Sequence, residues 1–298
     1  MASILVVGLN PAWQKIYRFP ILKKGEVNRV QEAQAFASGK GFNTAKVLKR
    51  LGHEVTLLQF VGGITGDLCL KDCEAEGIRS LHVNVPSETR TCLTLLEDKG
   101  RATEVIEPFA IPEQDWGPQL TALLPKGSEN FAGIAFCGTV PDGCPPWVLA
   151  EIMEPLLPYY AVMDGVRGLE DDFLRRLTCL KINRFEWDNL RRGLADPFDG
   201  NGPTVLVTDG GKPAAILEKG RELNRFILPQ ASPLQNPIGA GDTVTAGLLH
   251  FLLEGDNLAT AFRKALAMGV ASCQTLMPGD FSEADYQKCL TAIVQQEI

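Results

Sequence analysis

The sequence has few of the features that mark exported, membrane-spanning or nucleic-acid-binding proteins. Its opening residues, 1–7, contain no basic segment followed by a long apolar one, and no stretch approaches ~18 uninterrupted apolar residues. Basic residues are in the minority, with 29 Lys and Arg against 36 Asp and Glu and a net charge of −7. We therefore expect a cytoplasmic protein that binds neither membrane nor nucleic acid, although a local basic pocket is compatible with this balance.

Recognisable metal and disulfide patterns are also missing. The eight cysteines are scattered, and no CxxC pair occurs. The three histidines, His53, His82 and His250, have no Cys, His or carboxylate partner at the spacing of metal ligands. The cysteines are therefore interpreted as reduced, mostly buried thiols, and the histidines as packing or surface residues.

Several common catalytic and nucleotide-binding motifs are absent as well. The chain has no GxxxxGK[ST] loop, no GxSxG turn and no protein-kinase HRD or DFG set. The first predicted strand runs into residues 8–11 (GLNP), where a dinucleotide-binding fold would carry GxGxxG. This disfavours a dinucleotide-dependent dehydrogenase.

Apolar segments typical of strands alternate with segments of helical periodicity along most of the 298 residues. This rhythm predicts an α/β fold: a doubly wound, mostly parallel sheet with helices on both faces, in which ligands bind beyond the carboxyl ends of the strands. The predicted strands are 3–9, 54–60, 78–83, 132–137, 160–164, 179–182 and 203–208, with a hairpin at about 213–227. The predicted helices are about 42–51, 67–76, 112–124, 145–157, 169–177, 184–194, 241–254, 257–273 and 283–296.

Two segments interrupt this rhythm, at about 11–37 and 88–107. They hold turn residues, aromatic residues and short alternating pieces, which we interpret as strands that leave the main sheet. The first contains 15–19 and 27–30, and the second contains 89–96 and 102–106 around a hairpin-like turn at 98–100. The prediction is a single α/β domain over 1–298 with a small β-sheet lid formed by these two segments.

A glycine-rich turn, residues 236–243 (NPIGAGDT), opens a predicted helix near the end of the chain. The first amides of a helix have no intrahelical partner and, with the helix dipole, form an anion site. A negatively charged carboxylate is unexpected in an anion site. It is explained if Asp242 accepts a proton while the amides of 239–241 stabilise the negative charge of a group that is being transferred, as in phosphoryl transfer. The alternative is an ordinary helix cap, since Asp is a favoured capping residue.

A lysine between two glycines, Lys40, stands at the start of the first predicted helix. Glycines allow close backbone approach, and an ammonium group suits a phosphate. If the small sheet folds over the strand ends, Arg29 and Arg90 from its two segments could converge with Lys40 on one anionic group. Each of the three is, by itself, compatible with a solvated surface charge.

Other polar residues follow predicted strands, at the end where a doubly wound sheet binds its ligands. Asn183 and Glu186 lie three residues apart at a strand-to-helix junction and could together orient Mg²⁺ and its waters, although Glu is favoured in any first helical turn. The segment 208–212 (TDGGK) suits a nucleotide phosphate but equally an ordinary β-turn. The segment 138–141 (GTVP) could line the same crevice.

Taken together, these residues resemble those of the ribokinase-like sugar kinases of the phosphofructokinase B type. The resemblance runs in consistent order over essentially the whole chain and is closest to the branch that phosphorylates sugar phosphates, which includes 1-phosphofructokinase and tagatose-6-phosphate kinase. It rests on 9–12 (LNPA), 27–29 (VNR), 39–43 (GKGFN), 88–92 (ETRTC), 181–186 (KINRFE) and 236–242 (NPIGAGD).

The resemblance implies a Rossmann-like core, ATP and Mg²⁺ as cofactors, and a β-sheet lid that often forms a homodimer contact. It implies Asp242 as the base, with Gly239, Ala240 and Gly241 as the anion hole. On the nucleotide side it implies Asn183 and Glu186 for Mg²⁺ through water, Thr208, Gly210 and Lys212 near the nucleotide, and Ala271 near the adenine. On the acceptor side it implies Gln14, Gly39, Lys40, Asn43, Arg90 and Thr139, of which Lys40 and Arg90 grip a phosphate, with Arg29 as a weaker candidate.

Two positions depart from the pattern of this family. Gln14 stands where the family usually has an Asp that binds sugar hydroxyls, and Ser38 stands where this branch commonly has Gly. Gln both donates and accepts hydrogen bonds but lacks the negative charge. The expected reaction is transfer of the ATP γ-phosphoryl group to a hydroxyl of a ketohexose phosphate, of the fructose 1-phosphate or tagatose 6-phosphate type. A kinase for an unphosphorylated sugar or nucleoside and a catalytically silent sugar-phosphate sensor are the alternatives.

Overall fold

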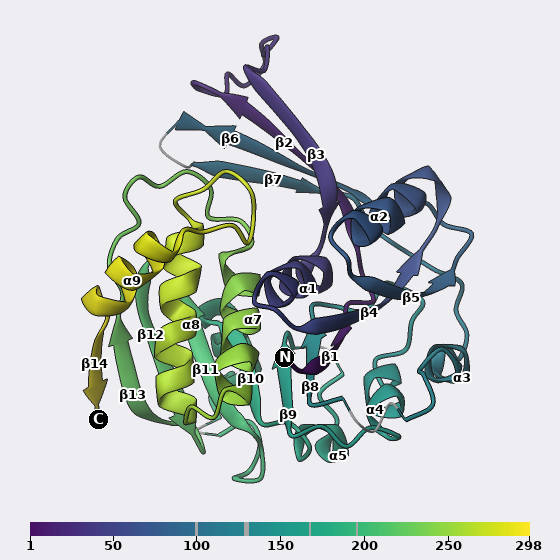
Figure 1. Ribbon diagram of the computed structural model, residues 1–298, viewed down its shortest axis with the longest axis vertical. Coiled ribbons are helices and arrows are strands. Elements are labelled where there is room, and N and C mark those ends of the chain that lie inside the picture. Colours follow the sequence, from purple (N-terminus) through teal and green to yellow (C-terminus); the bar gives the residue numbers. More distant parts are fainter. Residues whose placement is uncertain (99–100, 128–130, 167, 195) are drawn as a thin grey trace.

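The computed structural model describes residues 1–98, 101–127, 131–166, 168–194 and 196–298. A large ten-stranded sheet forms the body of the molecule, and a separate four-stranded sheet extends from one side of it (Figure 1). The turn predicted at 98–100 lies mostly outside the described residues.

The large sheet has the strand order β14-β13-β12-β11-β10-β9-β8-β1-β4-β5. The seven strands from β11 to β5 run parallel, whereas β12, β13 and β14 each pair antiparallel. The predicted mostly parallel sheet and the hairpin of β12 and β13 are therefore confirmed. The bounds are β1 Ser3–Val7, β4 Glu54–Val61, β5 Arg79–Asn84, β8 Gly133–Cys137, β9 Tyr160–Asp164, β10 Cys179–Asn183, β11 Thr204–Asp209, β12 Lys212–Glu218, β13 Arg221–Ile227 and β14 Val294–Glu297.

Helices cover both faces of this sheet (Figure 1), which confirms the doubly wound architecture. Their bounds are α1 Lys40–Arg50, α2 Gly63–Ala75, α3 Gly117–Ala122, α4 Val148–Met153, α5 Asp171–Leu174, α6 Arg184–Arg191, α7 Ala240–Leu253, α8 Leu258–Ser272 and α9 Glu283–Ala292. Successive side chains of a strand point to opposite faces. In β1, Ile4 and Val6 accordingly join the core under α1, α7 and α8, and Leu5 and Val7 join the core under α3 to α6.

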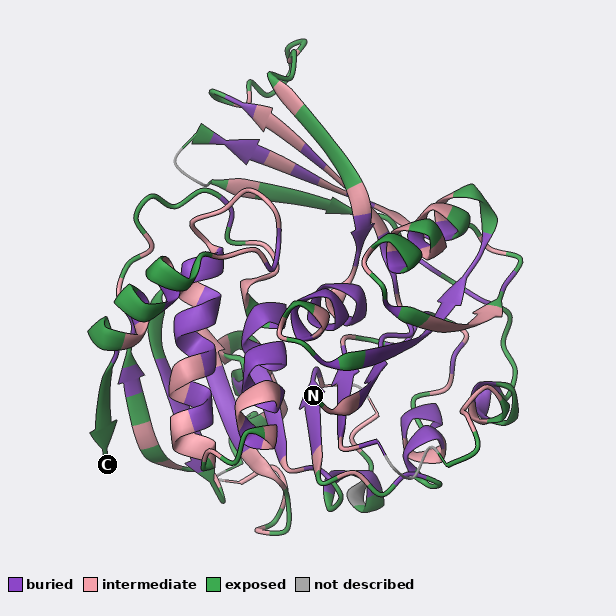
Figure 2. Ribbon diagram, viewed as in Figure 1, coloured by how far each residue is buried: buried purple, intermediate pink, exposed green. Residues whose placement is uncertain are grey.

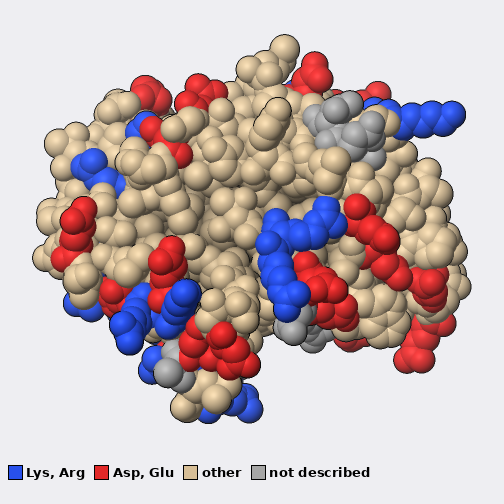
Figure 3. All heavy atoms as spheres, turned by 90° about the horizontal axis from the view of Figure 1, so that it is seen from below, with Lys and Arg blue, Asp and Glu red and all other residues tan. Residues whose placement is uncertain are grey.

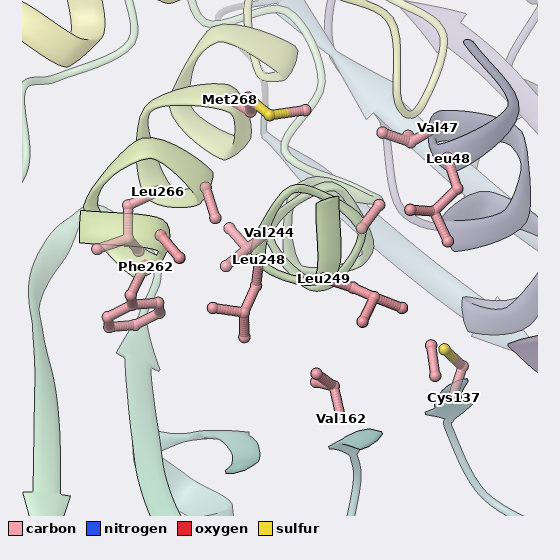
Figure 4. Close-up of a cluster of buried hydrophobic side chains, with 14 of the residues drawn as sticks. Val47, Leu48, Cys137, Val162, Val244, Leu248, Leu249, Phe262, Leu266 and Met268 are labelled. Carbon is pink, nitrogen blue, oxygen red and sulfur yellow. The ribbon is translucent and has the colours of Figure 1, made fainter. Parts of the chain in front are cut away.

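Helix α7 is buried along nearly its whole length (Figure 2). Figure 4 shows Leu248 and Leu249 of α7 between Leu266 of α8 and Leu48 of α1, with Val162 of β9 on the sheet side. A helix that is apolar on all sides is typical of a protein interior. This packing fixes the position of the first turn of α7, in which Asp242 lies.

The small sheet has the order β3-β2-β6-β7, with β2 and β6 parallel and both outer pairs antiparallel. It joins the body where the Ala37 amide donates to Asp72 Oδ2 of α2 at 2.7 Å. The two interrupting segments thus form a second sheet, as predicted. Residues 27–30, predicted as a strand, instead belong to the loop before β3, since tertiary pairing can override local alternation. The bounds are β2 Ala12–Phe19, β3 Glu32–Ser38, β6 Thr91–Glu97 and β7 Ala102–Ile106.

The helix predicted at 283–296 is too long. Helix α9 ends at Ala292, and the chain then forms β14, which pairs with β13 through Phe226↔Gln295 and its neighbours. The amide of Ile298 also donates to the Leu223 carbonyl at 2.9 Å. This strand depends on the free edge of β13, about seventy residues earlier in the chain, which local periodicity does not reveal.

No helix in the described part of the chain combines the length and the apolar character needed to cross a bilayer. On the face opposite the small sheet, Lys and Arg side chains lie beside Asp and Glu side chains (Figure 3). Buried charges gather elsewhere. Asp164, Lys181 and Asp242 are all buried at or near the carboxyl ends of the parallel strands.

Candidate active site

The glycine-rich turn at 239–241 leads directly into α7. Gly239 takes the left-handed conformation (φ 81°), and a Cβ added there would lie 2.6 Å from the Cβ of Pro278. The hydrogen bond from the Thr243 amide to the Gly239 carbonyl (2.9 Å) closes the first turn of α7. The amides of Gly241 and Asp242 lie before this bond in the chain, so they have no partner within the helix. The turn therefore has the geometry of an anion site at a helix N-terminus.

Asp242 is a buried carboxylate in this first turn, with 7% of its surface exposed. Its Oδ2 accepts a hydrogen bond of 2.7 Å from Asn43 Nδ2. Burial and the neighbouring charge of Asp164 raise the pKa of Asp242 to about 6. Lys40, Lys181 and the Asn43 hydrogen bond oppose this rise. A carboxyl group with a pKa near neutrality is suited to take a proton from a hydroxyl group and release it again.

A second buried carboxylate, Asp164 at the end of β9, was not among the predicted site residues. It lies between two ammonium groups: Lys40 Nζ is 2.8 Å from Oδ1, and Lys181 Nζ is 2.8 Å from Oδ2. Thr245 Oγ1 also donates to Oδ2 at 2.7 Å. Burial by itself raises the pKa of Asp164, but Lys181 and Lys40 outweigh it and hold the pKa well below its usual range. Asp164 is therefore a fixed negative charge.

The sequence contains a signal that could have indicated this cluster. Asp164 ends an otherwise apolar predicted strand, and Lys181 lies inside another. A charge in a strand of a buried parallel sheet needs a partner, because unpaired charges are costly to bury. Both strands were predicted, but their adjacency, β9 beside β10, follows only from the fold.

Lys40, the first residue of α1, faces this cluster. Burial lowers its pKa, but the charges of Asp164 and Asp242 raise it more, with a smaller contribution from Glu186. The net effect is a raised pKa, so this ammonium group remains charged. Its aliphatic stem lies against Gly138, since a Cβ added there would be 3.5 Å from the Lys40 Cβ.

Arg90 and Thr139 lie at the adjoining strand ends. The guanidinium of Arg90 donates from Nε to the Pro11 carbonyl (3.3 Å) and from Nη2 to the Asn10 carbonyl (3.1 Å). The side chain of Asn10 donates in turn to Thr139 Oγ1 at 3.0 Å. Because Thr139 follows the Gly138 that contacts Lys40, these residues all line the carboxyl ends of β1 and β8.

Arg29 is not brought to this site within one chain. It is exposed in the loop between β2 and β3, at the end of the small sheet farthest from α1. Along β2, Ala12 near the site and Arg18 near this loop are separated by about 20 Å, at 3.3 Å per residue. The expected convergence of Arg29 with Lys40 and Arg90 is therefore wrong for a single chain, because the strands carry the loop outward.

Gln14 and Gly39 lie where the small sheet meets the body. Gln14 is 4% exposed, and its Nε2 donates to Thr94 Oγ1 (2.8 Å) and to the Lys15 carbonyl (3.2 Å). The amide hydrogens are thus engaged within the small sheet. Gly39 packs against the Asn10 backbone just before α1 begins, with 3.2 Å between an added Cβ and the Asn10 carbonyl oxygen.

Asn183 and Glu186 cap each other at the start of α6. Asn183 Oδ1 accepts from the Glu186 amide (2.8 Å), and Glu186 Oε2 accepts from the Asn183 amide (2.9 Å). This reciprocal capping box matches the structural alternative raised by the sequence. The part of the chain that the structure describes holds no group of three or more Asp, Glu, His or Cys suited to a metal. Mg²⁺ bound with a nucleotide needs only one or two carboxylates, so Glu186 fits a partial donor set, whereas both oxygens of Asp164 are held by Lys40, Lys181 and Thr245.

A cavity of about 310 Å³ opens beside the first turn of α7. Ala271, expected near the adenine, is fully buried in α8, whereas its neighbours Val270 and Cys273 line the cavity. Lys212, expected near the nucleotide, pairs with Asp209 at 3.2 Å instead. The cavity is lined by glycines, which expose their backbone, and by apolar side chains, a combination that suits a nucleotide. The lining includes Thr208, Gly210, Leu228, Pro229, Leu234, Ala240, Gly241, Val244 and Leu266.

A larger cavity, of about 460 Å³, lies at the opposite ends of the strands. Lys49, Glu54 and Arg79 line it, at the end of α1 and the starts of β4 and β5. None of the buried carboxylates lies among its lining residues. Because ligands of doubly wound sheets bind at the carboxyl ends, we place the active site at the smaller cavity.

The chain has a ribokinase-like fold. Solved structures share this fold. Escherichia coli phosphofructokinase-2 in complex with fructose-6-phosphate is 21% identical over 98% of this chain and 99% of that chain, with a TM-score of 0.78. A possible 1-phosphofructokinase from Thermotoga maritima is 16% identical over 99% of each chain (TM-score 0.79), and Thermotoga maritima ribokinase is 19% identical over 98% of this chain and 100% of that chain (TM-score 0.73). The model of the family described as pfkB family carbohydrate kinase matches residues 1–154 and 178–284. The chain belongs to this family and is a carbohydrate kinase, a transferase that phosphorylates an alcohol group.

Proposed function

We propose that this kinase transfers the γ-phosphoryl group of ATP to a hydroxyl of a ketohexose phosphate, of the fructose 1-phosphate or tagatose 6-phosphate type. The observation that carries the proposal is Asp242, a buried carboxylate whose pKa is raised to about 6 in the turn beside the nucleotide-sized cavity. In this reaction Asp242 accepts the hydroxyl proton. The Gly239 and Gly241 amides would receive the negative charge of the moving phosphoryl group, whereas the Ala240 amide donates to the Pro237 carbonyl at 3.4 Å.

The nucleotide would occupy the 310 Å³ cavity. Its phosphates would meet Thr208, Gly210 and the start of α7, and its base would meet Val270 and Cys273, which take the place expected for Ala271. Glu186 and Asn183 are the groups proposed to hold Mg²⁺ through water. The ion would supply positive charge that offsets the charge of the phosphates.

On the acceptor side, Lys40 and Arg90 would hold the phosphate already present on the sugar. Both cations lie at the carboxyl ends of β1 and β8, on the side of α1 where Asn43 contacts Asp242. Guanidinium and ammonium groups together are a common phosphate-binding pair. Gln14, Gly39, Asn43 and Thr139 would then surround the sugar.

The alternative with an unphosphorylated sugar or nucleoside has a specific observation in its favour. Without any ligand, Lys40 is already paired with Asp164, and Arg90 already donates to the Asn10 and Pro11 carbonyls. Both cations therefore have protein partners and do not require a phosphate. The sensor alternative is weaker, because a silent sensor has no need for a buried carboxylate with a raised pKa.

We further propose that the small sheet is a lid that also pairs with a second copy of the chain, in the cytoplasm. Its outer strands β3 and β7 have no strand partner on their outer sides among the described residues. In β7, Val105 and Ile106 are 53% and 56% exposed. Exposed apolar residues on an edge strand favour association.

The acceptor class is tested with Arg90→Ala and a matched control, Arg79→Ala, at the amino end of β5. ADP release is measured with ATP, Mg²⁺ and a panel of sugars and their phosphates. We expect turnover of a ketohexose phosphate, and Arg90→Ala should raise its KM at least about tenfold, since charge-assisted hydrogen bonds to phosphate are lost. The KM for the free sugar and the kinetics of Arg79→Ala should change little. Equal effects of Arg90→Ala on phosphorylated and free sugars would reject the proposed acceptor class.

A further inference from the structure

Ser38 is a buried polar residue to which the proposed reaction assigns no role. It ends β3, just before α1, and is 3% exposed. Its Oγ donates to Asn43 Oδ1 at 3.2 Å, and Asn43 Nδ2 donates to Asp242 Oδ2 at 2.7 Å. Three buried side chains from β3, α1 and α7 thus form a chain of hydrogen bonds that ends on the carboxylate.

The chemistry of the three groups fixes which atom donates in each of these hydrogen bonds. An ionised carboxylate only accepts hydrogen bonds, so Asn43 must turn its NH₂ toward Asp242. The carbonyl oxygen of Asn43 then faces Ser38, where it needs a donor because it is buried. A serine hydroxyl is such a donor. The opposite orientation of the amide would place its oxygen against the carboxylate oxygen.

We propose that Ser38 is a positioning residue for phosphoryl transfer, because its hydroxyl holds the Asn43 carboxamide in the orientation that donates to Asp242. The inference rests on the proposed role of Asp242 as the base. Without the Ser38 hydroxyl, the Asn43 oxygen has no donor there, and the amide is free to turn away from the carboxylate. The hydrogen bond that favours the ionised, proton-accepting form of Asp242 is then formed less of the time.

The other groups that face Asp242 have opposing effects on its pKa, so the hydrogen bond from Asn43 influences the net value. Asp164 from β9 repels its negative charge, and burial disfavours that charge as well. Lys40 from α1 and Lys181 from β10 attract it, and the Cys137 thiol from β8, whose pKa is raised, remains neutral. Weakening the Asn43 contact removes one of the three influences that keep the pKa of Asp242 down, so this pKa should rise.

The test compares wild type with Ser38→Ala, which lacks the hydroxyl, and Ser38→Thr, which keeps it. The pH dependence of kcat/KM reports the free enzyme and is measured from about pH 5 to about pH 8. In Ser38→Ala the acid limb should move upward by roughly half a pH unit, so kcat/KM at about pH 5 should fall about threefold. Ser38→Thr should restore the wild-type profile. An unmoved limb in Ser38→Ala, or the same shift in both variants, would overturn the proposal.

Two further measurements separate this inference from the proposed function. In an Asn43→Ala background, Ser38→Ala should cause no additional shift, since the hydroxyl acts through Asn43; an undiminished second shift would overturn the proposal. The Asp242 carboxyl is also titrated directly by NMR of protein with ¹³C-labelled aspartate, with Asp242→Asn used to assign its signal. A higher pKa in Ser38→Ala supports the positioning role even if no tested sugar is phosphorylated, and an unchanged pKa contradicts it even in an active enzyme.

Discussion

Asp242 and Asp164 are both buried carboxylates near the same strand ends, yet their surroundings give them opposite behaviour. Asp164 lies between the ammonium groups of Lys40 and Lys181, which keep it ionised. Asp242 has the Asn43 amide as its hydrogen-bond partner and Asp164 as a like charge nearby, so its pKa rises toward neutrality. Two such carboxylates suit different roles: a fixed counter-charge and a proton acceptor.

The raised pKa of Asp242 predicts the pH dependence of the reaction. A base must be ionised, so kcat/KM should increase as the pH rises through about 6 and then level off. The measurement is the pH profile of kcat/KM under conditions in which the protein stays folded. An acid limb near pH ~4, the ordinary range of an Asp side chain, would contradict the account.

The pairing of Asp164 predicts a large effect on stability. Asp164→Asn leaves two ammonium groups facing a neutral amide, and Lys181 is almost fully buried. Removing one partner of a buried ion pair costs on the order of 3–5 kcal/mol, so denaturant unfolding should show a loss of this size. Asp209→Asn, at the end of β11, breaks only the exposed pair with Lys212 and should cost less than about 1 kcal/mol. Equal losses in the two variants would show that Asp164 is not an essential counter-charge.

The sequence predicts a role for Asp242 because its signal is local: small residues, a carboxylate and an apolar helix in one short segment. Asp164 contacts Lys181 and Thr245, which lie 17 and 81 positions away along the chain. No spacing rule links them, so only strand order and helix packing bring them together. The same holds for Arg29, whose chemistry suited a phosphate but whose loop lies at the far end of the small sheet.

At the scale of elements, α7 links the candidate site to a second buried contact. His250 near the end of this helix lies 2.9 Å from His53, measured from Nδ1 to Nε2, and His53 follows α1. The sequence predicts that both are isolated packing or surface residues, but the two rings contact each other. Burial and the nearby His250 lower the pKa of His53 to about 4.

This histidine contact predicts a loss of stability in mild acid. The unfolded chain binds a proton at His53 near pH ~6.5, whereas the folded protein does so only near pH 4. Between these values the unfolded state holds more protons, so stability falls as the pH falls through this window. Thermal unfolding at a series of pH values should show this decline in wild type and a shallower one in His53→Gln. Parallel curves for the two proteins would contradict the assignment.

Most elements of the large sheet were predicted because each carries its own periodicity. The exceptions depend on distant partners: β14 forms on the edge of β13, and β3 begins after the residues 27–30 that were predicted as a strand. Helices α3, α4 and α5 are also shorter than predicted. Pairing and packing, rather than local preference, decide such segments.

At the scale of the whole molecule, the fold brings four kinds of groups to one edge. The proposed base and the turn amides come from the start of α7, and the buried counter-charges come from β9 and β10. Lys40 comes from α1, and Arg90 comes from the segment that leads into the small sheet. The fold class and family follow from sequence patterns and are confirmed by the comparisons. The acceptor depends on side chains such as Gln14, whose amide hydrogens are held by Thr94 and Lys15, and remains a proposal.

The most direct test of the central claim is the turnover number of Asp242→Asn with ATP, Mg²⁺ and the acceptor on which wild type is most active. General-base assistance contributes on the order of 10²–10⁴ in rate, so kcat should fall by a factor in that range. The variant should remain folded and at least as stable as wild type at neutral pH, because it removes a buried charge near Asp164. A folded Asp242→Asn protein with a kcat close to that of wild type would contradict the account.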